Sequence, residues 1–269
     1  MAGSAVIAPV VPAAAMVLLA LWAQQPSRED VRPETLAAFQ RHVRARESAI
    51  ERERVQGRNF LWVDESDQRR KRVRSGGVVV EPLQGRGLID VKGGLVHDWI
   101  GATFIEGTSL SKAIATVQDY NRHQQYFKPE VVESKLLWRK ENEFGIFLRL
   151  VKKKVLTVTL DTEHRVRYFP LDATKVHSRS YSTRISEVED AGTSKEMALP
   201  PGEDHGFLWR LNSYWRFQER DGGVYVECEA ISLTRGIPTG FGWLVSPIVR
   251  DLPRESLEST LAGTRTMLD

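Results

Sequence analysis

Cysteine is nearly absent from this sequence, because Cys228 is the single one among 269 residues. An intramolecular disulfide and a metal site built from several thiolates are therefore both excluded. Cys228 lies in the alternating apolar run of residues 224–230, where a buried thiol behaves as a small hydrophobic side chain. No base stands near it in the sequence, so we expect a structural cysteine and not a nucleophile.

Recognisable catalytic motifs are missing as well. The six histidines show no HExxH or other paired-ligand spacing, which argues against a zinc site. The chain has no GxSxG sequence for an acyl nucleophile, and Gly85-Arg86-Gly87 lacks the rest of a phosphate-binding glycine motif. We therefore expect no metal, no cofactor and no assigned catalytic residue. The sequence leans towards a protein without enzymatic activity and leaves that question open.

A strong excess of one charge is also missing, since the net charge is only +3. Nucleic-acid-binding proteins concentrate far more basic charge on one face, so no nucleic-acid partner is expected. One dense basic segment covers residues 68–74, with cationic side chains at Arg69, Arg70, Lys71, Arg72 and Arg74. We interpret this segment as an exposed basic hairpin; the alternative is a surface that binds anionic lipid head groups.

The N-terminus carries a long uncharged run, because residues 5–23 are mainly alanine, valine, leucine and methionine. Residues 1–23 resemble a secretory signal peptide, with Ala23 as the small residue at the cleavage position. We expect export to a periplasmic or secreted location. The alternative is an uncleaved membrane anchor, since the run approaches the roughly 20 residues that span a bilayer.

Residues 24–90 are expected to form an N-terminal extension. Pro33 suits a first helical turn, and Leu36, Phe39 and Val43 follow at three-to-four spacing. This pattern predicts an amphipathic helix that ends near Gly57, followed by the basic, hairpin-like segment. We place a single folded domain over residues 91–269.

The pattern of residues 91–269 predicts an α+β domain. Strands are expected over residues 95–105, 131–139, 143–152, 154–161, 164–170, 174–188, 206–219 and 222–235. Short links such as Asp161-Thr162 predict antiparallel neighbours. A short helix follows residue 109, and helical spacing returns near the C-terminus, where Pro253 permits a new helical start.

This order of elements resembles the helix-grip fold of the START-like superfamily, which also includes the polyketide cyclases (SRPBCC proteins). The resemblance extends from Leu95 to Leu268, and it is carried by residues 120–135 and by residues 237–257, which are similar to the gripping helix. It implies an antiparallel sheet of about seven strands wrapped around a long C-terminal helix, here with an N-terminal helical extension.

The resemblance further implies a ligand cavity between the sheet and the terminal helix. The candidate lining residues are bulky and apolar or aromatic: Trp99, Phe104, Leu148, Leu150, Tyr168, Trp209, Leu211, Trp215, Val226, Trp243 and Leu244. The alternative is that they fill a dry core. His177, Arg179 and Tyr181 alternate with serines, and they could orient a ligand's oxygen or carboxylate if their face meets the cavity. Otherwise, their strand lies at a sheet edge.

These features lead us to expect an exported binding or carrier protein that holds a hydrophobic small molecule or a lipid. Two alternatives stay open. One is a cyclase- or dehydratase-like enzyme that uses the same cavity. The other is a peripheral membrane protein that acts through residues 69–74.

Overall fold

The computed structural model describes residues 29–154, 157–236 and 242–268, with the backbone alone for residues 29–30 and 242–250. The segment that resembles a signal peptide, residues 1–23, lies outside the described residues. Among the helices that are described, none is long and apolar enough to cross a membrane.

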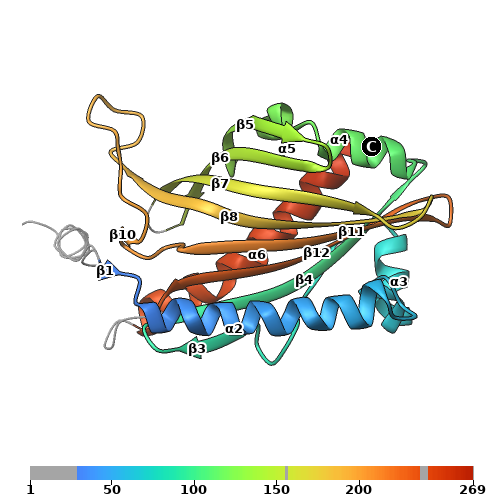
Figure 1. Cartoon of the computed structure of the whole chain (residues 1–269), viewed down its shortest axis with the longest axis horizontal. Coiled ribbons are helices and arrows are strands. Elements are labelled where there is room, and N and C mark those ends of the chain that lie inside the picture. Colours follow the sequence, from blue (N-terminus) through green and yellow to red (C-terminus); the bar gives the residue numbers. More distant parts are fainter. Residues whose placement is uncertain (1–28, 155–156, 237–241, 269) are drawn as a thin grey trace, which may run out of the picture.

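A ten-stranded antiparallel sheet forms the centre of the molecule (Figure 1). Its strands are β2 (Val79–Pro82), β3 (Leu88–Val91), β4 (Gly94–Glu106), β5 (Val131–Lys140), β6 (Glu143–Lys153), β7 (Thr157–Pro170), β8 (Lys175–Glu189), β9 (Met197–Ala198), β11 (Arg210–Arg220) and β12 (Gly223–Arg235). The neighbour order is β2-β4-β12-β11-β8-β7-β6-β5, with β3 beside β4 and β9 beside β8. Two short strands, β1 (Glu29–Asp30) and β10 (Glu203–Asp204), pair with each other.

Helices lie around this sheet, and the longest crosses it diagonally (Figure 1). They are α2 (Pro33–Ile50) with its continuing π-turn η1 (Glu51–Val55), η2 (Trp62–Glu65), α3 (Asp67–Arg74), α4 (Leu110–Val117), η3 (Tyr120–Arg122), α5 (His123–Tyr126) and α6 (Gly242–Leu268). The α6 helix is continuous through Pro253 and packs mainly against β4, β12 and β2. A meandering antiparallel sheet closed by a long C-terminal helix confirms the predicted helix-grip fold.

The predicted break at Asp161-Thr162 is wrong, because β7 runs through it without a turn. Asp161 lies opposite Arg149 of β6, and its carboxylate accepts two hydrogen bonds from that guanidinium, at 2.7 and 2.9 Å. A cross-strand ion pair therefore uses an aspartate that the sequence pattern suggested for a turn. The irregularity in this region is a β-bulge between Glu163 and His164.

The sheet face that meets α6, called the inner face below, carries the larger hydrophobic core. Leu257 and Leu261 of α6 pack there with aromatic and aliphatic residues of the strands. At Gly101 of β4 the approach is very close, since an added Cβ would lie 2.6 Å from a Leu261 methyl carbon. Because glycine has no side chain, α6 can pack closely on the sheet at Gly101.

The opposite, outer face is also covered, by the N-terminal extension. Phe39, Val43 and Ile50 of α2 pack on residues of β4, β11 and β12. The segment of residues 60–63 packs beside them against β2, β4 and Tyr225 of β12. The sheet therefore lies between helical layers on both faces.

The basic segment forms the helix α3 and not the expected hairpin. Ser66 caps this helix by accepting a hydrogen bond from the Arg69 backbone N–H at 3.3 Å. Asp67 lies in the first turn and three basic residues in the last, an arrangement that the helix dipole favours. Val73 is fully buried and joins the outer-face core, so the helix is attached to the sheet through one apolar residue.

Candidate ligand-binding face

The predicted cavity residues divide between the two faces of the sheet. Trp99, Tyr168 and Val226 belong to the inner core, and Leu148 and Trp215 pack against it. Side chains two residues apart on a strand share a face, so Leu150 and Leu211 join this set. Seven of the predicted residues therefore lie on one wall, facing α6.

Five predicted residues lie on the outer face, which corrects the expectation of a single cavity. Phe104 packs under α3, and Trp209 and Tyr181 pack under α2. His177 and Arg179 alternate with serines that face inward, so they also point outward. The sequence alone could have placed Phe104 on the outer face. It lies five residues from Trp99 on the same strand, and side chains an odd number of residues apart point to opposite faces. The side chains of Trp243 and Leu244 lie outside the described residues.

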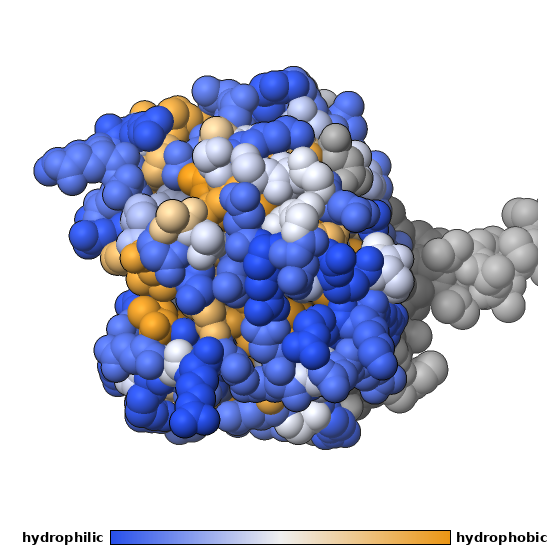
Figure 2. Space-filling model, turned by 90° about the vertical axis from the view of Figure 1, so that its right-hand side faces the viewer, coloured by the Kyte–Doolittle hydropathy of each residue, from blue (hydrophilic) through white to orange (hydrophobic). Residues whose placement is uncertain are grey.

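One end of the inner face is tightly filled. Tyr120 and Tyr168 are 4% and 6% exposed, and their hydroxyl groups share a hydrogen bond of 2.8 Å. Burial raises the pKa of Tyr168 to about 12, so both phenols stay neutral. Figure 2 looks at the end of the molecule that carries α3 and α4, where hydrophilic residues predominate and hydrophobic ones form separate patches. The two phenols therefore satisfy each other within a packed core.

Part of the inner face is less enclosed. The residues there are only partly buried, although they lie within the sheet; this open stretch comprises Leu148, Leu150, Ser182, Leu211, Ser213, Trp215 and Ala230. Two small side chains meet here, since Ala230 lies opposite Ser213 of β11, with Trp99 of β4 on its other side. Because α6 packs mainly on β4, β12 and β2, the strands from β11 to β6 are less covered by it.

The outer face has a polar cleft of about 410 Å³ where α2 passes into the π-turn. It is lined by Glu47, Ser48, Glu51, Arg52, Gln56 and Arg179. Tyr181 donates a hydrogen bond to Glu47 at 2.6 Å, and Arg179 donates one to Glu51 at 3.1 Å. The predicted polar residues thus hold α2 on the sheet, and this cleft offers no apolar wall to a hydrophobic ligand.

Buried charges under the extension are the feature that sequence reasoning missed. Arg216 and Glu227 lie opposite each other in the register, on a sheet face that would be exposed to solvent if no segment covered it. Their side chains are instead 1% and 0% exposed, with Arg216 Nε donating to Glu227 Oε2 at 3.1 Å. Nearby, Arg46 of α2 binds Glu229 at 3.0 Å, and His42 binds Asp98 at 2.8 Å. These contacts join α2 to the sheet.

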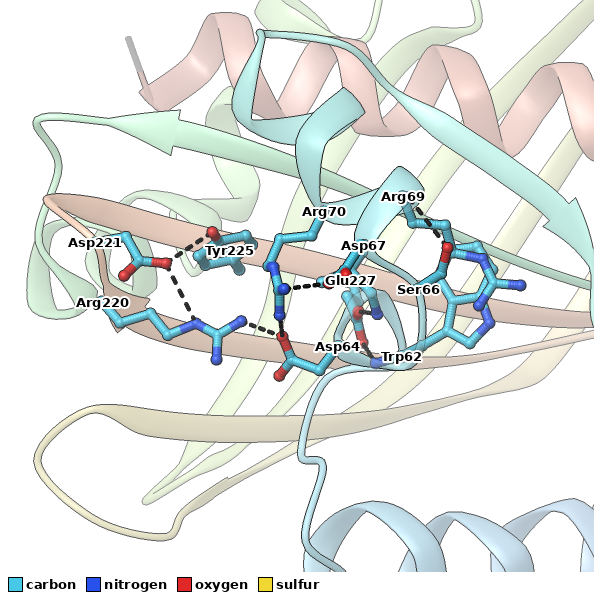
Figure 3. Close-up of polar contacts among 11 residues, drawn as sticks. Trp62, Asp64, Ser66, Asp67, Arg69, Arg70, Arg220, Asp221, Tyr225 and Glu227 are labelled. Atoms are coloured by element: carbon cyan, nitrogen blue, oxygen red, sulfur yellow. Dashed lines mark hydrogen bonds and ion pairs between the residues drawn. The ribbon is translucent and has the colours of Figure 1, made fainter.

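The basic helix is largely matched by neighbouring acidic and aromatic groups (Figure 3). The Arg69 guanidinium lies 4.0 Å from the centre of the Trp62 ring and pairs with Glu81. Arg70 pairs with Asp67. Arg74 lies over the Phe104 ring, 4.2 Å from its centre, while Lys71 and Arg72 are exposed. Binding to an anionic membrane stays a prediction, and it would depend chiefly on Lys71 and Arg72.

Neither a metal cluster nor a reactive thiol is found among the described residues. Within residues 29–154, 157–236 and 242–268, no group of three or more histidine, cysteine, aspartate or glutamate side chains could hold a metal ion. Burial raises the pKa of the Cys228 thiol well above its usual range, which keeps it protonated and unreactive. An apolar wall with few polar groups is typical of ligand sites.

Solved structures with a similar fold include a STAR-related lipid transfer protein from Xanthomonas axonopodis, at 18% identity and a TM-score of 0.47. That match covers 68% of this chain and 98% of the other. A START superfamily protein from Mycobacterium smegmatis matches at 12% identity and 0.39, covering 63% and 96%. The Zhui aromatase/cyclase from Streptomyces sp. R1128 matches at 12% and 0.36, covering 64% and 92%. No family model and no curated protein matches this sequence.

Proposed function

We propose that this protein binds and carries a hydrophobic small molecule or a lipid between the inner face of its sheet and α6. The proposal rests on the difference in solvent exposure between side chains of that face. Tyr168, Phe217 and Val226 are at most 6% exposed, whereas Leu148, Leu211 and Trp215 keep part of their surface exposed. Burial of such apolar surface by a ligand is worth about 25 cal/mol per Å².

Two of the similar structures are described as a lipid transfer protein and an aromatase/cyclase. Their likeness concerns the fold, and the two descriptions differ in activity. Carriage is favoured over the cyclase-like alternative because His177 and Tyr181, which could act as an acid–base pair, lie on the outer face, where Tyr181 is bound to Glu47. No described observation favours turnover at the open stretch.

Filling the open stretch is expected to weaken binding strongly. In Ala230→Trp a large ring would occupy the space between β4 and β11, so the affinity for a neutral apolar dye such as Nile red should fall at least about tenfold. Leu171→Trp is the matched control, because it adds the same side chain at an exposed position between β7 and β8. Equal dye binding by the two variants, measured by fluorescence titration, would contradict the proposal.

We further propose that the protein is exported and that residues 1–23 act as its signal. The basis is the uncharged run at residues 5–23 followed by the charged Arg28-Glu29-Asp30. Expression of the full sequence should yield a mature chain beginning near Gln24, readable by intact mass spectrometry. A full-length chain recovered from the membrane fraction would instead identify the segment as an anchor. Organic extraction of the same sample would reveal any co-purifying apolar compound.

A further inference from the structure

We propose that the ligand of the open stretch carries an uncharged hydroxyl or carbonyl oxygen on an apolar body, and that His164 of β7 binds this oxygen. The inference rests on the proposed function, since it concerns the same face. It defines the ligand class more narrowly, as an oxygen-bearing amphiphile in preference to a pure hydrocarbon or a charged lipid head group.

His164 faces the inner side of the sheet. It lies two residues from Val166 and four from Tyr168, which both belong to the inner core. Across the register it stands opposite Ile146 of β6 and Ser182 of β8. Ser182 belongs to the open stretch, so the imidazole lies at the border of that stretch.

The imidazole of His164 is left without a partner. Its side chain is 5% exposed, and the buried Nε2 atom has no hydrogen-bond partner among the described residues. Buried polar groups are nearly always satisfied, and leaving one unpaired lowers stability. The phenols of Tyr120 and Tyr168 at the filled end do satisfy each other. An unpaired polar side chain beside a partly open apolar wall is available to form a hydrogen bond with a bound ligand.

The surrounding side chains are small and uncharged. Ser180 lies diagonally from His164, and it stands opposite Val166 on one side and Ser213 on the other. The Ser182 hydroxyl already accepts the Leu211 backbone N–H at 3.0 Å, and the Ser213 hydroxyl accepts Trp215 Nε1–H at 3.1 Å. His164 and Ser180 are therefore the groups that we assign to the ligand.

The protonation state of His164 restricts the ligand's charge. Burial lowers the pKa of His164 to about 4, so the ring is neutral near pH 7, with one N–H donor and one acceptor nitrogen. A neutral imidazole can donate to a carbonyl or accept from a hydroxyl. It supplies no positive charge to a carboxylate or phosphate, and the facing side chains Ile146, Ser180 and Ser182 supply none either.

The test compares ligands that differ by one oxygen. Dodecane, 1-dodecanol, 2-dodecanone and dodecanoate would each compete with Nile red on the wild-type protein and on His164→Phe. The oxygen preference is the alcohol-to-alkane or ketone-to-alkane affinity ratio, and dividing the wild-type ratio by the variant ratio cancels the difference in solubility. We expect this quotient to be about fivefold to tenfold for the alcohol, the ketone or both, the value of one hydrogen bond, and close to one for dodecanoate.

The control is His177→Phe, which makes the same substitution on the outer face of the neighbouring strand and should leave the ratios unchanged. If His164→Phe fails to fold, Ser180→Val provides the test, with an expected quotient of about threefold. Competition by all compounds with a quotient of one would overturn this inference and leave the proposed function standing. A wild-type protein that binds neither the dye nor any of these compounds would overturn both.

Discussion

Replacing Glu227 by alanine is expected to destabilise the protein by about 3–5 kcal/mol, the cost of breaking a buried ion pair from one side. The Glu227 carboxylate accepts the backbone N–H groups of Trp62 and Val63 at 2.9 and 2.8 Å, and Arg216 Nε–H at 3.1 Å. Alanine would remove all three acceptor contacts. It would also leave the buried Arg216 guanidinium without its carboxylate partner. The two terminal nitrogens of Arg216 already have no hydrogen-bond partner among the described residues.

Urea unfolding would measure this loss. Glu106→Ala, at an exposed position at the end of β4, is the matched control and should change stability by less than about 0.5 kcal/mol. The double variant Arg216→Met/Glu227→Met removes the unpaired charge, so it should be less destabilised than Glu227→Ala. A loss in Glu227→Ala as small as in the control would show that apolar packing alone holds residues 60–63 on the sheet.

Acid is expected to unfold the protein over the range from about pH 6.5 to about pH 4. Burial is the main cause that lowers the pKa of four histidines to about 4, namely His97, His123, His164 and His177. In the unfolded chain these groups bind protons near pH 6.5. Their contribution is therefore fully present above that pH and is lost as the pH falls towards 4, at up to about 1.4 kcal/mol per pH unit for each histidine.

Two buried carboxyl groups act in the opposite direction. Burial raises the pKa values of Glu229 and Asp204, so the folded protein takes up protons before the unfolded chain does. Near pH 5 the four histidines take up about three to four protons on unfolding, and the two carboxyl groups reduce this number. The slope of unfolding free energy against pH gives the net number directly. His123→Gln should lower it by about one, and a stability that stays constant from pH 7 to pH 5 would contradict the assignment.

The sequence predicted the sheet and its closing helix well because their signals are local. The alternating apolar residues Phe144 and Ile146 indicated a half-buried strand, and the structure places both in the inner core. The hairpin connections gave the antiparallel neighbours. Turn propensity failed at Asp161 because a partner on the next strand, Arg149, uses the carboxylate that would otherwise favour a turn.

The covering of the outer face could not be predicted in this way. Nothing near Arg216 or Glu227 in the sequence says that a segment about 165 residues away will bury them. Reasoning from a known fold also directed attention to one cavity, so residues of both strand faces were assigned to it. Alternation alone placed Phe104 opposite to Trp99, and it placed Ser178 and Ser180 opposite to His177 and Arg179.

Because the chain is synthesised from its N-terminus, the contact between Trp62 and Glu227, which are far apart in the sequence, affects how fast the protein folds. The helices of the extension are synthesised early, but their docking surface on β11 and β12 is among the last parts of the sheet to be completed. Until then, Phe39, Val43 and Trp62 have no native surface to cover. Contacts this distant in sequence form slowly, and exposed apolar helices invite aggregation in the meantime. We therefore expect slow refolding, with a holding chaperone improving the yield by shielding the first 80 residues.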